Sequence, residues 1–297
     1  MYPRAFRYHR AGSLREAAEM LSQLGEGAKL LAGGQSLIPL MKLRFANPAD
    51  LVDLNFIKGA SYIQEEKDAI RIGALARHAE IQDSVAASKI PILCDCAAGI
   101  GDAQVRNRGT IGGSLAEADP SGDWATVLMT LATDVRCFSR DGERIIGLRD
   151  FVKDAYTTAL RHDELVSEAS IQVPPKASGG AYIAFKRAAP VYPTASVAVQ
   201  LTVEGDTCKE ASIALGCVAL VPVRPHEAES ALRGQRISEK TIAAAAEAAR
   251  AAADPQTDMR GSAEYKRELV GALVQRAIAA AVRRARGEQL EVSHLYA

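Results

Sequence analysis

Apolar positions in the first third of the chain recur first with helical and then with strand-like spacing. Apolar residues lie three or four positions apart from Ser13 to Leu24, which predicts an amphipathic helix. Ser13 and Glu16 have the spacing of a capping box, and Gly25 supplies a stop signal. The strand-like runs that follow are short: Ala28–Leu31, Leu51–Leu54, Ser61–Gln64 and Ile70–Leu75. Short strands mixed with helices predict an α+β fold and not a regular doubly wound sheet.

The second half of the chain predicts a β-sheet followed by helices. A buried helix is expected at Asp123–Leu131, around the single tryptophan, Trp124. The segment Pro174–Gly180 combines prolines and glycines and is the best candidate linker. We therefore expect a first domain at residues 1–176 and a second at residues 177–297. The second domain contains three β-rich runs and two long helices: Tyr182–Lys186, Ala195–Val203, Ala211–Val221, Glu239–Ala252 and Ala263–Arg286.

The composition excludes several classes of function. The 297 residues contain 36 Lys or Arg and 36 Asp or Glu, so no net charge would attract nucleic acid or an anionic membrane. No apolar run approaches the roughly 18 residues that a membrane-spanning helix needs. The first residues lack the pattern of a signal peptide, so we expect a cytoplasmic protein. The cysteines lack disulfide or metal-site spacing, and we expect no metal site or iron–sulfur cluster on this chain: Cys94, Cys96, Cys137, Cys208 and Cys217.

A strand that ends in a glycine pair is the first candidate binding segment. Without side chains at Gly33 and Gly34, backbone N–H groups can face a phosphate, and Ser36 adds a hydroxyl donor. A glycine pair after a strand is more often only a turn, so this segment alone does not establish a phosphate site. The candidate residues are Leu30, Leu31, Ala32, Gly33, Gly34, Gln35, Ser36 and Leu37.

A second glycine pair lies further along the chain, preceded by Arg106 and Arg108. By itself it could equally be a surface loop with solvated arginines, but two such segments could hold the two phosphates of a pyrophosphate from both sides. The motif GxxxxGK[ST] is missing and Gly99–Gln104 departs from GxGxxG, so a dinucleotide here predicts a non-Rossmann fold. The candidate residues are Thr110, Ile111, Gly112, Gly113 and Ser114.

Two charged residues are candidates for contacts with other parts of a nucleotide. Asp123 could accept hydrogen bonds from ribose hydroxyls, or could cap the helix that it begins. Lys186 ends a predicted buried strand, where an unpaired cation is costly. Its charge could act on an anionic group such as a reduced flavin, or the side chain could extend to solvent. We find no motif for a catalytic base or nucleophile and predict no catalytic residue.

Several segments together resemble a known family. AGGQSLIPLMK (Ala32–Lys42), QVRNRGTIGGS (Gln104–Ser114), ADPSGDW (Ala118–Trp124) and FKR with the downstream Tyr192 occur in that order and at suitable spacing. They are similar to the FAD-binding medium subunit of molybdenum hydroxylases, the family of carbon monoxide dehydrogenase and xanthine dehydrogenase. The likeness runs through nearly the whole chain.

The resemblance implies a fold and a site. The first domain would have the two-subdomain FAD-binding fold of vanillyl-alcohol oxidase and para-cresol methylhydroxylase. The second would be a three-stranded antiparallel sheet with helices. The FAD pyrophosphate would lie at Ala32–Ser36 and Thr110–Ser114, and Asp123 near the ribityl and ribose hydroxyls. Ile100, Lys186 and Tyr192 match positions near the isoalloxazine ring.

The resemblance also implies a division of labour among subunits. A large subunit would oxidise the substrate at a molybdenum cofactor, and a small subunit would carry [2Fe–2S] clusters. This chain would pass the electrons through FAD to an external acceptor, in a dimer of heterotrimers. The alternatives are a stand-alone FAD-dependent oxidoreductase and a scaffold that no longer binds FAD. The substrate and the final acceptor stay open.

Two departures from the family pattern bear on the site. The second glycine segment usually continues with Asn, and Ser114 stands in that place. A single hydroxyl predicts weaker anchoring of FAD, not its loss. The segment from Glu164 to Pro174 is slightly longer than the pattern, which leaves open whether Leu165 or Val166 touches the ring.

Overall fold

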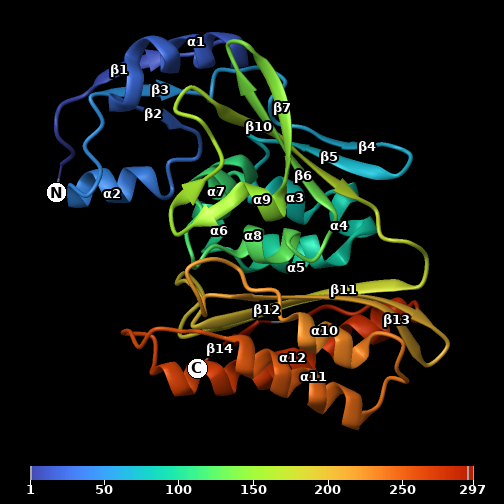
Figure 1. Cartoon of the computed structure of the whole chain (residues 1–297). Helices are drawn as coiled ribbons and strands as arrows, with labels where there is room; N and C mark the ends of the chain where they lie inside the picture. The colour runs from blue at the N-terminus through green and yellow to red at the C-terminus, as the bar shows by residue number, and fades with distance from the viewer. Residues whose placement is uncertain (1, 293, 297) are drawn as a thin grey trace.

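The computed structural model describes residues 2–292 and 294–296. They form three modules stacked in order from the N-terminus to the C-terminus (Figure 1), each built on its own sheet. We call them the N-terminal, central and C-terminal modules. The mixture of helices and strands confirms the α+β prediction. Among the described residues, no helix is both long and apolar enough to cross a membrane.

The N-terminal module is built on a parallel sheet in the order β1-β3-β2. The predicted helix and the predicted strand Ala28–Leu31 are confirmed. The Ser13 hydroxyl accepts a hydrogen bond from the Glu16 N–H (3.1 Å). The Glu16 carboxylate binds the N–H of Gly12 (2.7 Å) and does not close the capping box on Ser13. The elements are β1 (Arg7–Arg10), α1 (Leu14–Leu24), the 3₁₀ turn Gly25–Gly27, β2 (Ala28–Leu31), α2 (Leu37–Leu43) and β3 (Asp50–Asp53).

The central module is an antiparallel sheet in the order β4-β5-β10-β6-β7, with most of the short helices packed against it. The predicted strands are confirmed with ends shifted by one or two residues, but the helix at Asp123 ends at Leu128 and not at Leu131. The elements are β4 (Ile63–Glu65), β5 (Ala69–Gly73), α3 (His78–Gln82), α4 (Val85–Lys89), α5 (Pro91–Gly99), α6 (Ala103–Arg106), α7 (Ile111–Glu117), α8 (Asp123–Leu128), β6 (Thr133–Ser139), β7 (Gly142–Gly147), α9 (Leu148–Phe151), β8 (Val152–Asp154), β9 (Thr157–Thr158) and β10 (Leu165–Gln172).

The C-terminal module confirms the predicted antiparallel sheet and the two long helices. The sequence did not predict α10 or the short strand β14, which adds a parallel edge to the sheet. β13 ends at Gly216, before the expected end at Val221. The elements are β11 (Ser178–Lys186), β12 (Ala195–Glu204), β13 (Thr207–Gly216), α10 (His226–Leu232), α11 (Glu239–Ala252), α12 (Ala263–Ala285) and β14 (Leu295–Tyr296).

The glycines of the predicted linker lie inside a strand. Gly179 and Gly180 belong to β11, so the linker prediction is wrong at its C-terminal end. A Cβ atom on Gly179 would lie 2.1 Å from the Ala281 carbonyl oxygen, so glycine is required for the α12 backbone to pack on β11. These glycines serve close packing and not flexibility.

The sheet of the C-terminal module is buried on both faces. Tyr182 and Ala184 join the core of the central module, whereas Ala181 and Ile183 pack among the helices α10 to α12. The seam between the two modules is therefore a continuous apolar core, and it brings β11 against α5. Lys186, on the same face as Tyr182, is carried into this seam.

Candidate cofactor-binding site

The two glycine-rich segments, one after β2 and one at the start of α7, pack directly on each other. A Cβ atom on Gly33 would lie 2.2 Å from the carbonyl oxygen of Arg108 and 2.7 Å from Cα of Gly109. A Cβ atom on Gly112 would lie 2.5 Å from Cβ of Ala74, at the end of β5. The structure thus brings the two predicted segments together, and these two glycines allow the contact.

The first segment presents a row of unbonded donors. From Gly33 to Leu37, no backbone N–H group donates a hydrogen bond to any residue that the structure describes. Gly34 has a φ of 74°, which favours glycine, and the Ser36 side chain at the N-cap of α2 makes no capping hydrogen bond. Consecutive N–H groups without acceptors form a surface that suits an anion.

The second segment is different, because its N–H groups are already used. Thr110 caps α7, so the glycine pair lies in the first turn of a helix and not in a loop. The N–H groups of Ile111–Ser114 all bind oxygen atoms of the protein, that of Gly113 to the Thr110 hydroxyl at 3.1 Å. This segment offers a ligand the exposed surface of Gly113 and the Ser114 hydroxyl, which has no hydrogen bond within the described part of the chain.

Two residues that the sequence analysis missed connect the segments. The Asn55 side chain donates to the Ala32 carbonyl (2.8 Å), and Arg77 donates to the Asn55 side chain (2.6 Å) and to the Arg108 carbonyl. Burial and the charge of Arg108 lower the pKa of Arg77. An anion beside these two guanidinium groups would relieve their repulsion. The available signal was weak: Asn55 follows a parallel strand, where ligand sites often lie.

His78 supports the second segment from beneath. His78 is buried, and its ring Nδ1 accepts a hydrogen bond from the Trp124 indole (3.0 Å). Its backbone N–H donates to the Gly109 carbonyl (3.1 Å). A Cβ atom on Gly109 would lie 2.6 Å from its ring. Burial and the nearby Arg77 and Arg106 lower the pKa of His78 to about 4. A neutral ring is therefore part of the support for this segment.

Asp123 does not cap a helix, since Gly122 occupies the N-cap position of α8. Asp123 is 5% exposed, and its carboxylate accepts a hydrogen bond from the hydroxyl of Tyr182 (2.6 Å), a residue that the sequence analysis missed. Burial, with the Asp123 charge, raises the pKa of Tyr182, which remains a neutral donor. A Cβ atom on Gly122 would lie 3.9 Å from Ser114 Oγ, so the second glycine segment reaches the turn before Asp123.

Lys186 is buried and has no carboxylate partner. The residue is 1% exposed, and Nζ donates to the carbonyl of Gly99, the residue before Ile100. The alternative that Lys186 extends to solvent is therefore wrong. Within residues 2–292 and 294–296 it forms no salt bridge. A buried ammonium with a carbonyl as its partner would be stabilised by an anion.

Tyr192 lies in the turn between β11 and β12. It is 42% exposed, and the Arg260 guanidinium lies 5.7 Å from the centre of its ring. Partial burial and the nearby Asp119 carboxylate raise the pKa of Tyr192. An exposed aromatic ring close to the acidic turn before Asp123 is available for stacking on a planar ligand.

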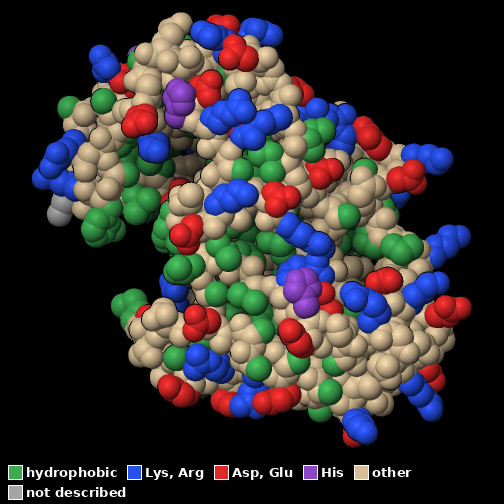
Figure 2. Space-filling model, in the orientation of Figure 1, with side chains coloured by type: hydrophobic (Ala, Val, Ile, Leu, Met, Phe, Trp, Pro, Cys, Tyr) green, Lys and Arg blue, Asp and Glu red, His purple; other side chains and the backbone are tan. Residues whose placement is uncertain are grey.

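The surface is hollowed next to these segments. Figure 2 shows a hollow on the left, between the lobe that carries α2 and the C-terminal module. In Figure 1, α6 and α7 border the same region. Two other hollows, of about 260 and 630 Å³, share Arg149, Arg224 and His226 and contain none of the residues that the sequence predicted.

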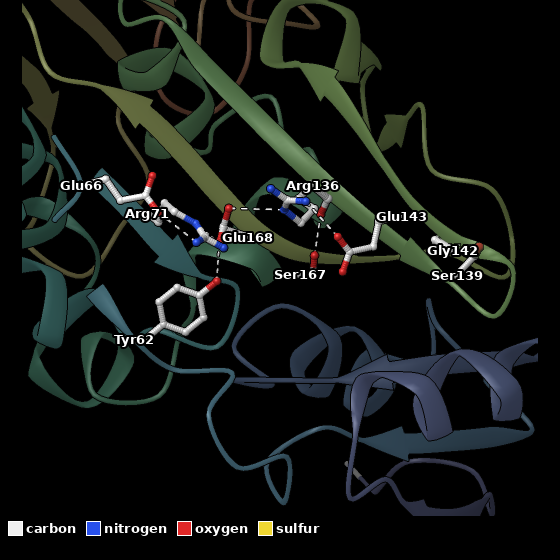
Figure 3. A network of polar contacts seen from close by, with 9 residues as sticks. All are labelled: Tyr62, Glu66, Arg71, Arg136, Ser139, Gly142, Glu143, Ser167 and Glu168. Carbon is white, nitrogen blue, oxygen red and sulfur yellow. Dashed lines mark hydrogen bonds and ion pairs between the residues drawn. The ribbon is translucent and has the colours of Figure 1, made fainter. Parts of the chain in front are cut away.

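A charged network fixes the strand that carries Leu165 and Val166 (Figure 3). Glu168 on β10 is 1% exposed and accepts hydrogen bonds from Tyr62, from Arg71 (2.7 Å) and from Arg136 (3.4 Å). Burial raises its pKa, but the bonds from Arg71 and Tyr62 outweigh burial, and the pKa of Glu168 is lowered.

The network lies beside an irregularity in β10 between Val166 and Glu168. Leu165 and Val166 are both buried, but they belong to the cores of different modules. The Ser167 carbonyl accepts a hydrogen bond from Ala74 (2.9 Å), and the Ala74 carbonyl accepts one from Gly112 (3.0 Å). The irregular strand is thus tied to the second glycine segment.

Comparison with known protein families covers almost the whole chain. Residues 4–176 match the family described as the FAD binding domain in molybdopterin dehydrogenase. Residues 180–281 match the family described as the CO dehydrogenase flavoprotein C-terminal domain.

Individual relatives agree with both matches. The carbon monoxide dehydrogenase medium chain of Afipia carboxidovorans is 40% identical, over 96% of this chain and 100% of the relative. The 6-hydroxypseudooxynicotine dehydrogenase complex subunit alpha of Paenarthrobacter nicotinovorans is 37% identical, over 99% of this chain and 100% of the relative. A solved carbon monoxide dehydrogenase from Hydrogenophaga pseudoflava superimposes with a TM-score of 0.93 at 38% identity, covering 96% of this chain and 99% of that one.

Proposed function

The chain belongs to the FAD-binding subunits of the molybdenum hydroxylases, an oxidoreductase family whose cofactor on this subunit is FAD, and from that premise we propose how it transfers electrons. It takes electrons from [2Fe–2S] clusters on a partner subunit and delivers them to an external acceptor. Bound FAD supplies the chemistry that joins one-electron and two-electron transfers. The protein binds the cofactor, orients it and adjusts its potential.

The observation that carries the proposal is the row of unbonded N–H groups from Gly33 to Leu37 beside the half-buried Arg77. Donors without acceptors next to a cation fit a pyrophosphate. The buried Lys186 fits the same ligand at its other end, because it lacks a carboxylate partner. The residues present therefore fit FAD.

Each predicted site residue receives a role under this proposal. The segment Ala32–Ser36 holds the pyrophosphate through its unbonded N–H groups, which begin at Gly33. Thr110–Ser114 lies against the other side of the pyrophosphate and contributes the Ser114 hydroxyl. Leu30, Leu31 and Leu37 flank the first segment. Asp123, oriented by Tyr182, receives the ribityl and ribose hydroxyls. Lys186 places its charge near the isoalloxazine ring, Ile100 contacts the ring, and Tyr192 stacks on it.

The names of the relatives support the proposed partners. One relative is a medium chain and another a subunit of a dehydrogenase complex, which supports a heteromeric assembly. We propose a large molybdenum-cofactor subunit and a small [2Fe–2S] subunit, in a cytoplasmic dimer of heterotrimers. Because the relatives act on chemically different substrates by name, the substrate is selected on the large subunit.

A charge placed at Ser36 tests the phosphate site. Two like unit charges 4 Å apart repel by roughly 4 kcal/mol near a protein surface, and even a third of that weakens binding about tenfold. Ser36→Asp should therefore weaken FAD binding at least tenfold, measured as bound FAD per chain and as the dissociation constant.

Ser36→Asn is the matched control, because Asn has the shape of Asp without its charge, and it should retain FAD. Equal FAD content in both variants would mean that no phosphate lies at this segment. Loss of FAD from both would indicate a steric effect at Ser36, and the proposal would then have no support from this position.

A further inference from the structure

The chain after α12 returns to the seam between the central and C-terminal modules. Arg284, in the last turn of α12, donates to the Leu290 carbonyl through Nε (3.1 Å) and Nη2 (2.7 Å). Two residues of β14 then pair in parallel with the end of β11, with Tyr296 opposite Lys186 in the register. The tail is thus attached where β11 presents its buried lysine.

His294 is inserted into this seam by two hydrogen bonds. The Ala184 N–H donates to Nδ1 (3.2 Å), and Nε2 lies 3.0 Å from the Asp95 carbonyl oxygen. A backbone N–H can only donate and a carbonyl can only accept, so Nδ1 is unprotonated and Nε2 carries the proton. The ring also meets Tyr182 edge-on, with centroids 5.7 Å apart.

The ring of His294 occupies the space above Gly99. A Cβ atom on Gly99 would lie 1.9 Å from Nε2, so only glycine at position 99 accommodates the ring. The carbonyl of this same Gly99 accepts the hydrogen bond from Lys186 Nζ. His294 and Lys186 therefore contact one residue, the residue before Ile100.

The surroundings of His294 favour its neutral form. Lys186 on β11 faces it with a positive charge, while Asp95 on α5 is engaged by Arg284 of α12 at 2.6 and 2.8 Å, and Asp123 on α8 is bonded to Tyr182. Burial, with the charge of Lys186, lowers the pKa of His294. A second cation in this seam would repel Lys186.

We propose that His294, delivered by the C-terminal tail, is a positioning residue of the flavin site that fixes the Gly99 carbonyl and so holds Lys186 in place. The inference rests on the proposed function for one point, the location of Lys186 beside the flavin. It adds that His294 sets how strongly the Lys186 charge acts on FAD.

The test measures the flavin midpoint potential and the FAD content of the assembled complex. His294→Ala frees Lys186 and should lower the potential, in the same direction as Lys186→Met and by no more than that variant. His294→Asn, whose side-chain oxygen can accept the Ala184 bond, should restore most of the difference. His162→Ala, at an exposed histidine, is the control and should leave the potential unchanged.

A second variant disturbs the contact between the His294 ring and Gly99 without changing His294. Gly99→Ala forces the ring out of its place and should shift the potential as His294→Ala does. In the Lys186→Met background, neither change should shift it further, because both act through Lys186.

The outcomes separate this inference from the proposed function. A wild-type potential in both His294→Ala and Gly99→Ala, together with a shift in Lys186→Met, would overturn the role of His294 and leave the flavin site standing. An undiminished shift from His294→Ala in the Lys186→Met background would also overturn it. No shift in Lys186→Met itself would remove Lys186 from the flavin, and with it the premise of the inference.

Discussion

Lys186 is the residue at which sequence and structure agree most usefully. Its position at the end of an apolar strand predicted a cation that needs an anionic partner, and the structure buries it with the Gly99 carbonyl as its hydrogen-bond acceptor. The sequence could not show that carbonyl, because Gly99 is far away along the chain. Alternation along β11 did contain the signal for Tyr182, which lies four residues before Lys186 and shares its face.

Removing the charge of Lys186 should make the flavin harder to reduce. A charge-assisted hydrogen bond contributes roughly 1.5–3 kcal/mol, which for a two-electron couple corresponds to roughly 30–65 mV. Lys186→Met should lower the midpoint potential by that amount in a spectroelectrochemical titration, whereas Lys176→Met, at an exposed lysine, should not. An unchanged potential would place Lys186 away from the ring.

His78 should make the stability of the chain depend on pH. Its pKa is lowered from 6.5 to about 4, so between these values the unfolded chain binds more protons than the folded chain. The contribution of the neutral His78 to the unfolding free energy, about 3 kcal/mol, is therefore fully present above pH 6.5 and is lost as the pH falls toward 4. His78→Asn keeps an acceptor for Trp124 without the titration, and its urea-unfolding free energy should fall less over this range. Parallel pH profiles of the two proteins would contradict this role.

At the scale of elements, the sequence predicted a boundary correctly where residues at that boundary determine it. Ser13, Ser238 and Ser262 each cap the helix that was predicted behind them. The failures lie where distant parts of the chain decide the structure. Gly112 and Gly113 lie in a helix, and Gly179 and Gly180 lie in a strand. An added Cβ would meet distant backbone atoms at Gly112 and Gly179, and side-chain atoms at Gly113 and Gly180. Glycine permits loops and close contacts alike, so composition alone did not distinguish them.

The same contact makes Gly179 a position where a single methyl group is costly. Gly179→Ala places Cβ 2.1 Å from the Ala281 carbonyl, and overpacking of this kind typically costs about 1–3 kcal/mol. Gly27→Ala, where Cβ would lie 3.7 Å from Ala49 Cβ, should change the unfolding free energy by less than about 1 kcal/mol. Equal stability of the two variants would mean that α12 does not rest on β11 at this point.

At the scale of the whole molecule, the proposed FAD site draws on all three modules. Gly33 to Leu37 belong to the N-terminal module, Asp123 and Ile100 to the central module, and Lys186 and Tyr192 to the C-terminal module. Asp95 and Arg284 form a buried ion pair that joins α5 to α12 across the seam. The order of motifs indicated one shared site. The seam and the positions of Arg77 and His294 could be identified only from the structure.

The central claim is that this chain is the FAD-carrying, electron-transferring subunit of a molybdenum hydroxylase. The most direct test is the visible absorption spectrum of the tagged chain, purified gently from its native host together with the proteins that accompany it. We predict flavin bands, broad iron–sulfur absorption and co-purifying larger and smaller chains. Flavin bands on the chain alone, with turnover of a substrate unaided, or an assembled complex without flavin, would contradict the claim.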